Sequence, residues 1–220
     1  MDLSNYIEHT LLKPHVGWPE IQNLCQEAIE HQFVGVCIPP FYVADAVKFL
    51  ENTPVKVITV VGFPMGYSAI SAKVEEAKKA VDDNADEVDM VVNLAAVKDK
   101  KWAYVRNDID SVTRATHLKG KILKVILETG LLDNDEILKL CQICIEVGVD
   151  YIKTSTGING SGATIEAISF IKKCLAGTSL KIKASGGIRN AKFAIQLINA
   201  GANRLGTSAG INIIGEKLTV

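Results

Sequence analysis

Short runs of β-branched and other apolar residues alternate along the chain with stretches whose apolar residues recur at helical spacing. The runs begin 21 to 35 residues apart, which fits repeating units of about 30 residues that each hold one strand and one helix. Seven runs are clear, at residues 34–38, 55–61, 87–92, 122–127, 149–152, 180–182 and 203–206, and a weaker one lies at 7–12. The pattern predicts eight strands, with helices between them.

The runs are apolar over nearly their whole length, which is typical of a parallel sheet covered by helices. Between them, four apolar stripes predict helices. The stripes comprise residues 21, 24, 25, 28 and 29, then 74, 77 and 81, then 137, 141, 144 and 145, and then 165, 168, 171 and 175.

Strict alternation of strands and helices leaves an open doubly wound sheet or a closed barrel. An open nucleotide-binding sheet favours a glycine-rich turn after its first strand, whereas the early turns here read Pro39-Pro40-Phe41 and Phe63-Pro64-Met65-Gly66. The number of units and the late glycine motifs favour the barrel. We therefore predict an α/β fold, a single-domain (β/α)8 TIM barrel over residues 1–220 with a short N-terminal helical segment.

Charge and cysteine content narrow the classes of function. The chain has 24 basic and 25 acidic side chains, without the basic excess typical of nucleic-acid binding. No apolar run approaches the roughly 18 residues that cross a bilayer, and residues 1–6 lack the stretches of a secretory signal. The five scattered cysteines indicate reduced thiols in a cytoplasmic protein.

Two sequence features that often mark metal sites give only weak evidence for one in this chain. Cys141 and Cys144 have CxxC spacing but lie in a helical stripe, so core packing is favoured over a metal or redox role. The four histidines show no ligand spacing, so we predict no catalytic metal.

Charged residues stand in or directly after the predicted strands, where a barrel of this type places its chemistry. Lys153 closes the run 149–152. Desolvation at the barrel mouth would lower the pKa of this lysine and give a free amine that attacks carbonyls. The alternative is a lysine whose charged end reaches solvent at the rim.

Lys183 ends the neighbouring predicted strand. Two ammoniums roughly 6 Å apart repel by about 3 kcal/mol at an effective dielectric near 20, so one amine becomes neutral while its partner stays cationic. The alternative is that Lys181 and Lys183 are the polar ends of a short strand.

Asp89 lies in the middle of the run 87–92, and Lys124 is equally embedded in the run 122–127. A carboxylate among β-branched residues needs a partner. Asp89 therefore relays protons through water or orients an amine, or else it forms a structural ion pair with Lys124.

Two motifs late in the chain indicate a phosphate-binding site. Two glycine motifs, Ser185-Gly-Gly-Ile-Arg189 and Gly206-Thr-Ser-Ala-Gly210, follow the last two predicted strands. Such loops hold phosphate in many barrels of this type, and Thr207 and Ser208 add hydroxyl donors. The segment 157–162 lacks dinucleotide-binding spacing and is expected to end in a helix cap near Ala163.

Eight segments spread from about residue 5 to residue 210 resemble the deoxyribose-phosphate aldolase family. They are Glu8–Pro14, Val36–Ile38, Val61–Gly66, Glu87–Asn93, Lys124–Gly130, Asp150–Gly157, Lys183–Arg189 and Arg204–Ser208. The resemblance implies a cytosolic class I aldolase of deoxynucleoside catabolism. It would need no metal or other cofactor, act on a sugar phosphate, and form a homodimer or homotetramer. The family reaction is reversible cleavage of 2-deoxy-D-ribose 5-phosphate into acetaldehyde and D-glyceraldehyde 3-phosphate.

By motif position, the resemblance makes Lys153 the Schiff-base nucleophile and Asp89 and Lys183 the proton donors or acceptors, with Lys183 also perturbing the pKa of Lys153. It implies a second set of residues that bind the substrate and its phosphate, namely Thr154, Gly157, Gly186, Gly187, Thr207 and Ser208. A third set would support the site, namely Glu8, Thr10, Cys37 and Lys124.

The chain departs from the family pattern at four places. Glu8 replaces the usual aspartate, Ile158 stands where some members carry a basic residue, and Ala209 replaces a frequent serine. Residues 217–220 lack the terminal tyrosine that helps proton transfer in some members.

Two alternative functions fit the same residues. One is another phosphate-binding barrel enzyme, an isomerase or a different sugar-phosphate lyase, in which the lysines only pair with a substrate anion. The other is a barrel that senses sugar phosphates without catalysis.

Overall fold

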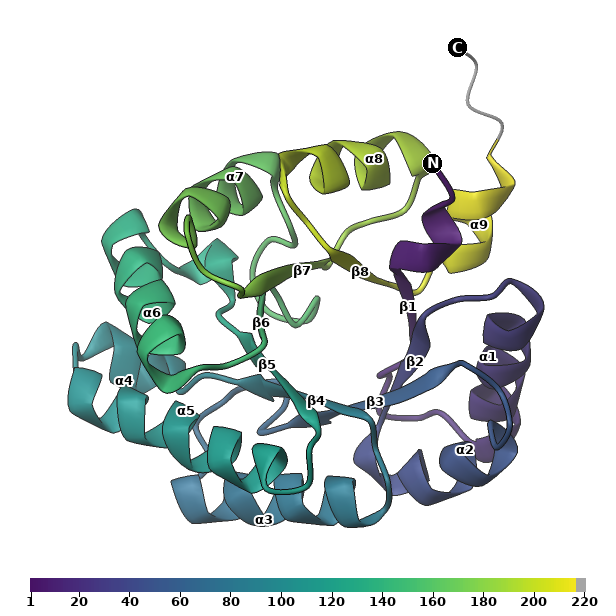
Figure 1. Cartoon of the computed structure of the whole chain (residues 1–220), viewed down its shortest axis with the longest axis horizontal. Coiled ribbons are helices and arrows are strands. Elements are labelled where there is room, and N and C mark those ends of the chain that lie inside the picture. Colours follow the sequence, from purple (N-terminus) through teal and green to yellow (C-terminus); the bar gives the residue numbers. More distant parts are fainter. Residues whose placement is uncertain (217–220) are drawn as a thin grey trace.

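Parallel strands β1 to β8 form one closed barrel within residues 1–216, the part of the chain that the computed structural model describes. Each strand pairs with the next in the sequence, and β8 pairs with β1 to close the ring (Figure 1). Helices surround the ring on the outside. The predicted α/β barrel is confirmed. The last four residues of the predicted domain, on which the tyrosine comparison rests, lie outside the described residues.

Every predicted run overlaps a strand, including the weak first run. The strands are β1 (Ile7–Thr10), β2 (Gly35–Ile38), β3 (Lys56–Val61), β4 (Glu87–Val91), β5 (Ile122–Ile126), β6 (Tyr151–Lys153), β7 (Lys181–Ser185) and β8 (Arg204–Thr207).

The four predicted stripes fall in helices α1, α3, α6 and α7, and the short N-terminal helical segment is a 3-10 helix, η1 (Leu3–Tyr6). The helices are α1 (Trp18–Glu30), α2 (Val43–Phe49), α3 (Ile70–Asp82), α4 (Leu94–Lys98), α5 (Trp102–His117), α6 (Asn134–Val147), α7 (Ile165–Cys174), α8 (Ala191–Ala200) and α9 (Gly210–Gly215), with further 3-10 turns η2 (Pro40–Tyr42) and η3 (Thr129–Leu131). The cap expected near Ala163 is at Thr164, whose side chain accepts the backbone N–H of Ala167.

Apolar side chains form two separate clusters. The larger one fills the space between the strands and the surrounding helices. The smaller one contains Cys37, Ile58 and Val60 of β2 and β3, with Leu12 and Phe63 packed against it. The remaining strands contribute buried charged residues, so the barrel interior is apolar on one side and ionic on the other.

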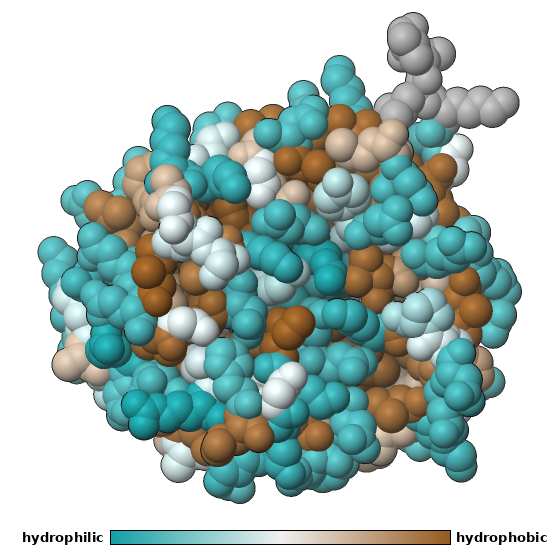
Figure 2. Space-filling view, viewed as in Figure 1, coloured by the Kyte–Doolittle hydropathy of each residue, from teal (hydrophilic) through white to brown (hydrophobic). Residues whose placement is uncertain are grey.

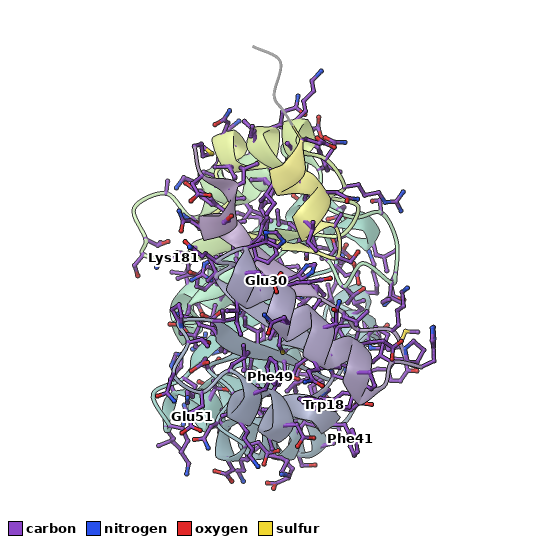
Figure 3. The ribbon with its side chains drawn as sticks, turned by 90° about the vertical axis from the view of Figure 1, so that its right-hand side faces the viewer. Trp18, Glu30, Phe41, Phe49, Glu51 and Lys181 are labelled. Atoms are coloured by element: carbon purple, nitrogen blue, oxygen red, sulfur yellow. The ribbon has the colours of Figure 1, made fainter. Side chains whose placement is uncertain are left out.

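The two ends of the barrel are distinct. In the side view of Figure 3, Lys181 at the start of β7 lies at one end and Phe41, after the end of β2, at the opposite end. The loops that follow the strands therefore gather at the Phe41 end. In Figure 2 hydrophilic residues cover most of the visible face, and hydrophobic residues form scattered patches between them.

The cysteines are reduced and mostly internal. Cys141 and Cys144 are buried in α6, and burial raises the pKa of Cys144 to about 12. This placement confirms that the two cysteines of the CxxC sequence pack in the core. Within residues 1–216, no group of three or more His, Cys, Asp or Glu side chains is arranged to hold a metal ion. In the same range, no helix combines the length and apolar character needed to cross a membrane.

A buried ion pair outside the barrel ties α3 and α5 to the end of β4. Lys73 Nζ donates to Asp108 Oδ2 at 2.6 Å and to the carbonyl of Val91 at 2.9 Å, and both charged side chains are fully buried. Burial lowers the pKa of Lys73 and raises that of Asp108, although each partner's charge opposes the shift. The pair thus anchors α3 and α5 to the end of β4, although burying the two charges costs desolvation free energy.

Replacing Lys73 with Met leaves the Asp108 carboxylate buried without its ammonium. We expect the free energy of unfolding to fall by about 3 to 5 kcal/mol, whereas the double variant K73M/D108L recovers most of this loss because neither charge remains. Urea unfolding measures both values. A single variant as stable as the wild type would contradict this role for the pair.

Candidate active site

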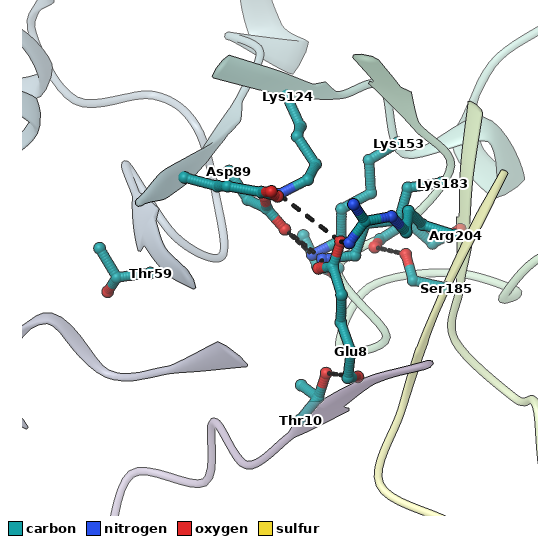
Figure 4. A network of polar contacts seen from close by, with 12 residues as sticks. Glu8, Thr10, Thr59, Asp89, Lys124, Lys153, Lys183, Ser185 and Arg204 are labelled. Atoms are coloured by element: carbon teal, nitrogen blue, oxygen red, sulfur yellow. Dashed lines mark hydrogen bonds and ion pairs between the residues drawn. The ribbon is translucent and has the colours of Figure 1, made fainter. Parts of the chain in front are cut away.

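Charged side chains from β1, β4, β5, β6, β7 and β8 meet inside the barrel (Figure 4). Alternate residues of a strand face the same side, so Glu87 and Asp89 both face inward. The strand register aligns Asp89 with Lys124, and Lys153 with Lys183. The predicted neighbourhood of Lys153 and Lys183 is present in the structure.

The Asp89 carboxylate contacts three lysines. Its Oδ1 accepts a hydrogen bond from Lys124 Nζ at 2.9 Å, and its Oδ2 accepts one from Lys153 Nζ at 2.9 Å and one from Lys183 Nζ at 2.6 Å. Burial alone would raise the pKa of Asp89, but the three ammoniums outweigh it and hold this pKa well below its usual range. Asp89 is therefore ionised. It pairs with Lys124, as the structural interpretation predicts, and it also contacts both predicted catalytic lysines.

Lys183 is held by two carboxylates. Its Nζ donates to Glu8 Oε2 as well as to Asp89. Burial favours the neutral amine, but Asp89 and Glu8 together raise the pKa of Lys183 above its ordinary value. The Lys183 side chain passes close to Gly206 on its way to Glu8 of β1, and a Cβ on residue 206 would lie only 2.9 Å from Lys183 Cε. Lys183 is thus a cation at neutral pH.

Lys124 has the most carboxylate neighbours. Its Nζ lies 2.5 Å from Glu87 Oε2, 2.9 Å from Asp89 Oδ1 and 3.7 Å from Glu8 Oε1. Burial opposes its charge, but these carboxylates raise the pKa of Lys124 well above its usual value. Burial likewise opposes the charge of Glu87, and Lys124 nevertheless lowers the pKa of Glu87 to about 2.

Lys153 differs from the other two lysines. Asp89 is its one carboxylate partner within 4 Å among the described residues, and its side chain is 3% exposed. The lysine also lines a cavity of about 280 Å³. The Asp89 carboxylate contacts both the Lys153 and the Lys183 ammonium and offsets the repulsion between them that the sequence alone predicts.

The cavity brings together most of the residues predicted to bind a phosphate. Its lining includes Lys153, Gly157, Gly186, Gly187, Thr207, Ser208 and Thr10. The three glycines have positive φ angles of 77°, 87° and 76°, a backbone region that favours glycine. Lys13 and Arg189 also line the cavity and add positive charge that the sequence did not single out as phosphate ligands.

Two predicted phosphate ligands use their hydroxyl groups within the protein. Thr154 Oγ1 donates to the carbonyl of Ser185 at 3.2 Å and accepts the N–H of the same residue, and Thr154 is buried. Thr207 Oγ1 donates to the carbonyl of Ile188 and accepts the N–H of Ala209. Both hydroxyls therefore connect neighbouring loops.

The predicted supporting residues lie around the ionic cluster. Glu8 reaches Lys183 directly, and the Thr10 hydroxyl donates to the Glu8 carbonyl. Cys37 is buried in the barrel, and burial raises the pKa of its thiol. Sequence reasoning missed Glu87 and also Arg204, which lies 3.7 Å from Glu8.

One of the family departures lies at the cavity: Ile158 is 58% exposed and lines it. Ala209 is half-buried and precedes α9. Neither side chain offers a phosphate a hydrogen bond.

The sequence model of the DeoC/LacD family aldolases matches residues 7–215, nearly all of the barrel. The chain belongs to the DeoC/LacD aldolase family.

Individual relatives cover the barrel equally well. A deoxyribose-phosphate aldolase of Thermococcus gammatolerans is 44% identical over 216 residues, which span 97% of this chain and 96% of the relative. The solved structure of QR15, an aldolase, has a TM-score of 0.92 at 42% identity and covers 97% of this chain and 95% of its own. The tetrameric deoxyribose phosphate aldolase from Aeropyrum pernix has a TM-score of 0.91 at 29% identity and covers 96% of this chain and 89% of its own.

The lowered pKa of Glu87 predicts a pH-dependent part of the aldolase's stability. Its pKa falls from 4.5 to about 2 on folding. This shift contributes about 3 kcal/mol that is present above pH 4.5 and is lost as pH falls toward about 2. Urea unfolding at steps between about pH 5 and pH 3 should show a shallower loss of stability in Glu87→Gln than in the wild type. Equal slopes would contradict this assignment.

Proposed function

We propose that this DeoC/LacD aldolase reversibly cleaves 2-deoxy-D-ribose 5-phosphate into acetaldehyde and D-glyceraldehyde 3-phosphate through a Schiff base on Lys153. The observation that carries the proposal is the grouping of three lysines around Asp89 at the base of a cavity lined by glycine-rich loops and two cations. The relative from T. gammatolerans carries the name of this activity.

Lys153 is the nucleophile because it alone of the three lysines lines this cavity, and because its deprotonation breaks one ion pair. Its neutral amine adds to C1 of the open-chain sugar, and loss of water gives an iminium ion. When the C2–C3 bond breaks, the C3 hydroxyl gives up its proton and becomes the aldehyde of D-glyceraldehyde 3-phosphate, and the electron pair of the broken bond moves into the iminium and forms an enamine. Protonation of C2 and hydrolysis then release acetaldehyde and restore the amine.

Asp89 and Lys183 move the protons that these steps require, together with a water molecule. Lys183 is cationic and donates, while the Asp89 carboxylate accepts, and both lie within hydrogen-bond distance of one another. Asp89 also contacts Lys153, so a proton can pass among the three groups. Lys124, itself held by Glu87, holds Asp89 in place and helps to keep it ionised.

The phosphate binds at the loops after β6, β7 and β8. Gly157, Gly186 and Gly187 allow its oxygens close to the backbone, and Ser208 donates a hydroxyl. Lys13 and Arg189 supply the charge that Ile158 does not. Binding energy from this remote group orients the sugar over Lys153.

We further propose that residues 1–220 act as one cytoplasmic catalytic domain in the catabolism of deoxyribose phosphate and assemble as a homo-oligomer. The tetrameric relative from A. pernix supports assembly. A dimer or tetramer is the expected result of light scattering on the purified chain.

A variant that keeps the charge but removes the nucleophile separates this proposal from the isomerase and sensor alternatives. We expect Lys153→Arg to lose acetaldehyde release from 2-deoxy-D-ribose 5-phosphate by at least about 1,000-fold, since a guanidinium forms no imine. Lys181→Arg, on the neighbouring strand at the opposite end of the barrel, is the matched control.

The readout is acetaldehyde formation followed with a coupled dehydrogenase. Turnover by Lys153→Arg at the wild-type rate would overturn the covalent mechanism. A wild-type protein that is stabilised by the sugar phosphate but releases no acetaldehyde would instead favour the sensor.

The placement of Lys13 predicts how the aldolase recognises phosphate. We expect Lys13→Ala to raise KM for 2-deoxy-D-ribose 5-phosphate about tenfold, roughly 1.4 kcal/mol, and to leave 2-deoxy-D-ribose turnover nearly unchanged. Lys48→Ala, an exposed lysine of α2, controls for loss of surface charge. An equal effect of Lys13→Ala on both sugars would contradict a phosphate contact.

A further inference from the structure

Glu128 is a buried carboxylate that the proposed mechanism leaves without a role. It follows β5 and precedes η3, and its φ of 62° is unusual for a residue with a side chain. On either side of it, the N–H of Leu127 donates to the carbonyl of Lys153, and the N–H of Thr129 donates to that of Thr154. Between these two hydrogen bonds the chain after β5 advances by two residues and the chain after β6 by one. Glu128 is therefore the extra residue of a β-bulge beside Lys153.

The Glu128 side chain holds the loop that follows Lys153. Both of its carboxylate oxygens lie 3.2 Å from the backbone nitrogen of Thr156, and Oε2 also accepts the Thr156 hydroxyl proton. The same hydroxyl oxygen accepts the N–H groups of Ile158 and Asn159, at 3.1 and 3.2 Å. One carboxylate therefore fixes the course of residues 156–159.

The held loop reaches across the barrel mouth. The side-chain amide of Asn159 donates to the carbonyl of Pro64, after β3, at 2.9 Å. The hydrogen-bonded chain thus runs from the end of β5 over the mouth to the loop after β3.

The loop also packs too closely to shift freely. A Cβ on Gly130 would lie 2.5 Å from Ser161 Oγ, and one on Gly162 would lie 2.1 Å from the carbonyl oxygen of Gly186. Thr156, Gly157 and Ile158 line the same cavity as Lys153. The position of the loop therefore sets one wall of the reaction cavity.

We propose that Glu128 is a positioning residue of the aldolase: by clamping Thr156 it fixes the loop that shapes the cavity over Lys153. This inference rests on the proposed function. A carboxylate suits the task because both of its oxygens face the Thr156 N–H, whereas an amide offers one acceptor and a donor that faces the donors of Thr156. A misplacement of about 1 Å at such a site costs up to about 100-fold in rate.

Four variants test the clamp. We expect Glu128→Gln to lower kcat between about 10- and 100-fold, and Thr156→Val about tenfold, because each removes part of the clamp. Thr156→Ser keeps both donors and should rescue activity to within about threefold of the wild type. Glu136→Gln is the matched control, because Glu136 is a buried carboxylate that caps α6 by accepting the Asp133 N–H. It should lower stability and leave kcat within about twofold.

The rate of borohydride-trapped imine formation with acetaldehyde separates positioning from simple loss of stability. Acetaldehyde has no phosphate, so a fall in this rate parallel to kcat, in protein whose thermal transition is intact at the assay temperature, supports the clamp.

Glu128→Gln that folds and keeps wild-type kcat would overturn the proposal. So would Thr156→Ser that is as impaired as Thr156→Val. If Glu128→Gln does not fold, the two Thr156 variants decide. A wild type that releases no acetaldehyde refutes the proposed function itself, which distinguishes that failure from the failure of the clamp.

Discussion

The Asp89 carboxylate shares its two oxygens among three lysines, which come from the three neighbouring strands β5, β6 and β7. Two of them, Lys124 and Lys183, have further carboxylate partners and remain cationic, whereas Lys153 has Asp89 alone among the described residues and lines the cavity. The additional carboxylates, Glu8 and Glu87, therefore distinguish three chemically identical side chains that Asp89 holds together.

Such a cluster is expensive to bury, and the architecture confines it. Apolar side chains of β2 and β3 fill one part of the barrel interior, and the larger apolar cluster between strands and helices supplies most of the buried surface. Among the described residues, the lysines Lys124, Lys153 and Lys183 face the carboxylates Glu8, Glu87 and Asp89, so each buried charge in the cluster has a partner of opposite sign. The half-buried Arg204 lies next to Glu8 at the edge of the cluster.

The strands and the key lysines were predictable because both leave local signals. Continuous apolar runs mark buried parallel strands, and a lysine at the end of such a run stands out. The β1 run was weak because Glu8, a residue of the ionic cluster, interrupts it. Helix α5 gave no clear stripe because Asp108 and Thr113 share its buried face with apolar residues. No local pattern shows that Asp89 touches Lys153, 64 residues away across the barrel. The proposed roles of Lys13 and Glu128 likewise depend on loop conformations that spacing does not encode.

The most direct test is to determine which lysine forms the covalent adduct with acetaldehyde. The wild-type protein is incubated with acetaldehyde and borohydride, digested, and sequenced by tandem mass spectrometry. We predict that the reduced two-carbon adduct is found on Lys153, and that Lys124 and Lys183 stay unmodified because their carboxylate partners keep them protonated. An adduct on Lys183 or Lys124 in place of Lys153, or no adduct under conditions that label another class I aldolase, would contradict the central claim.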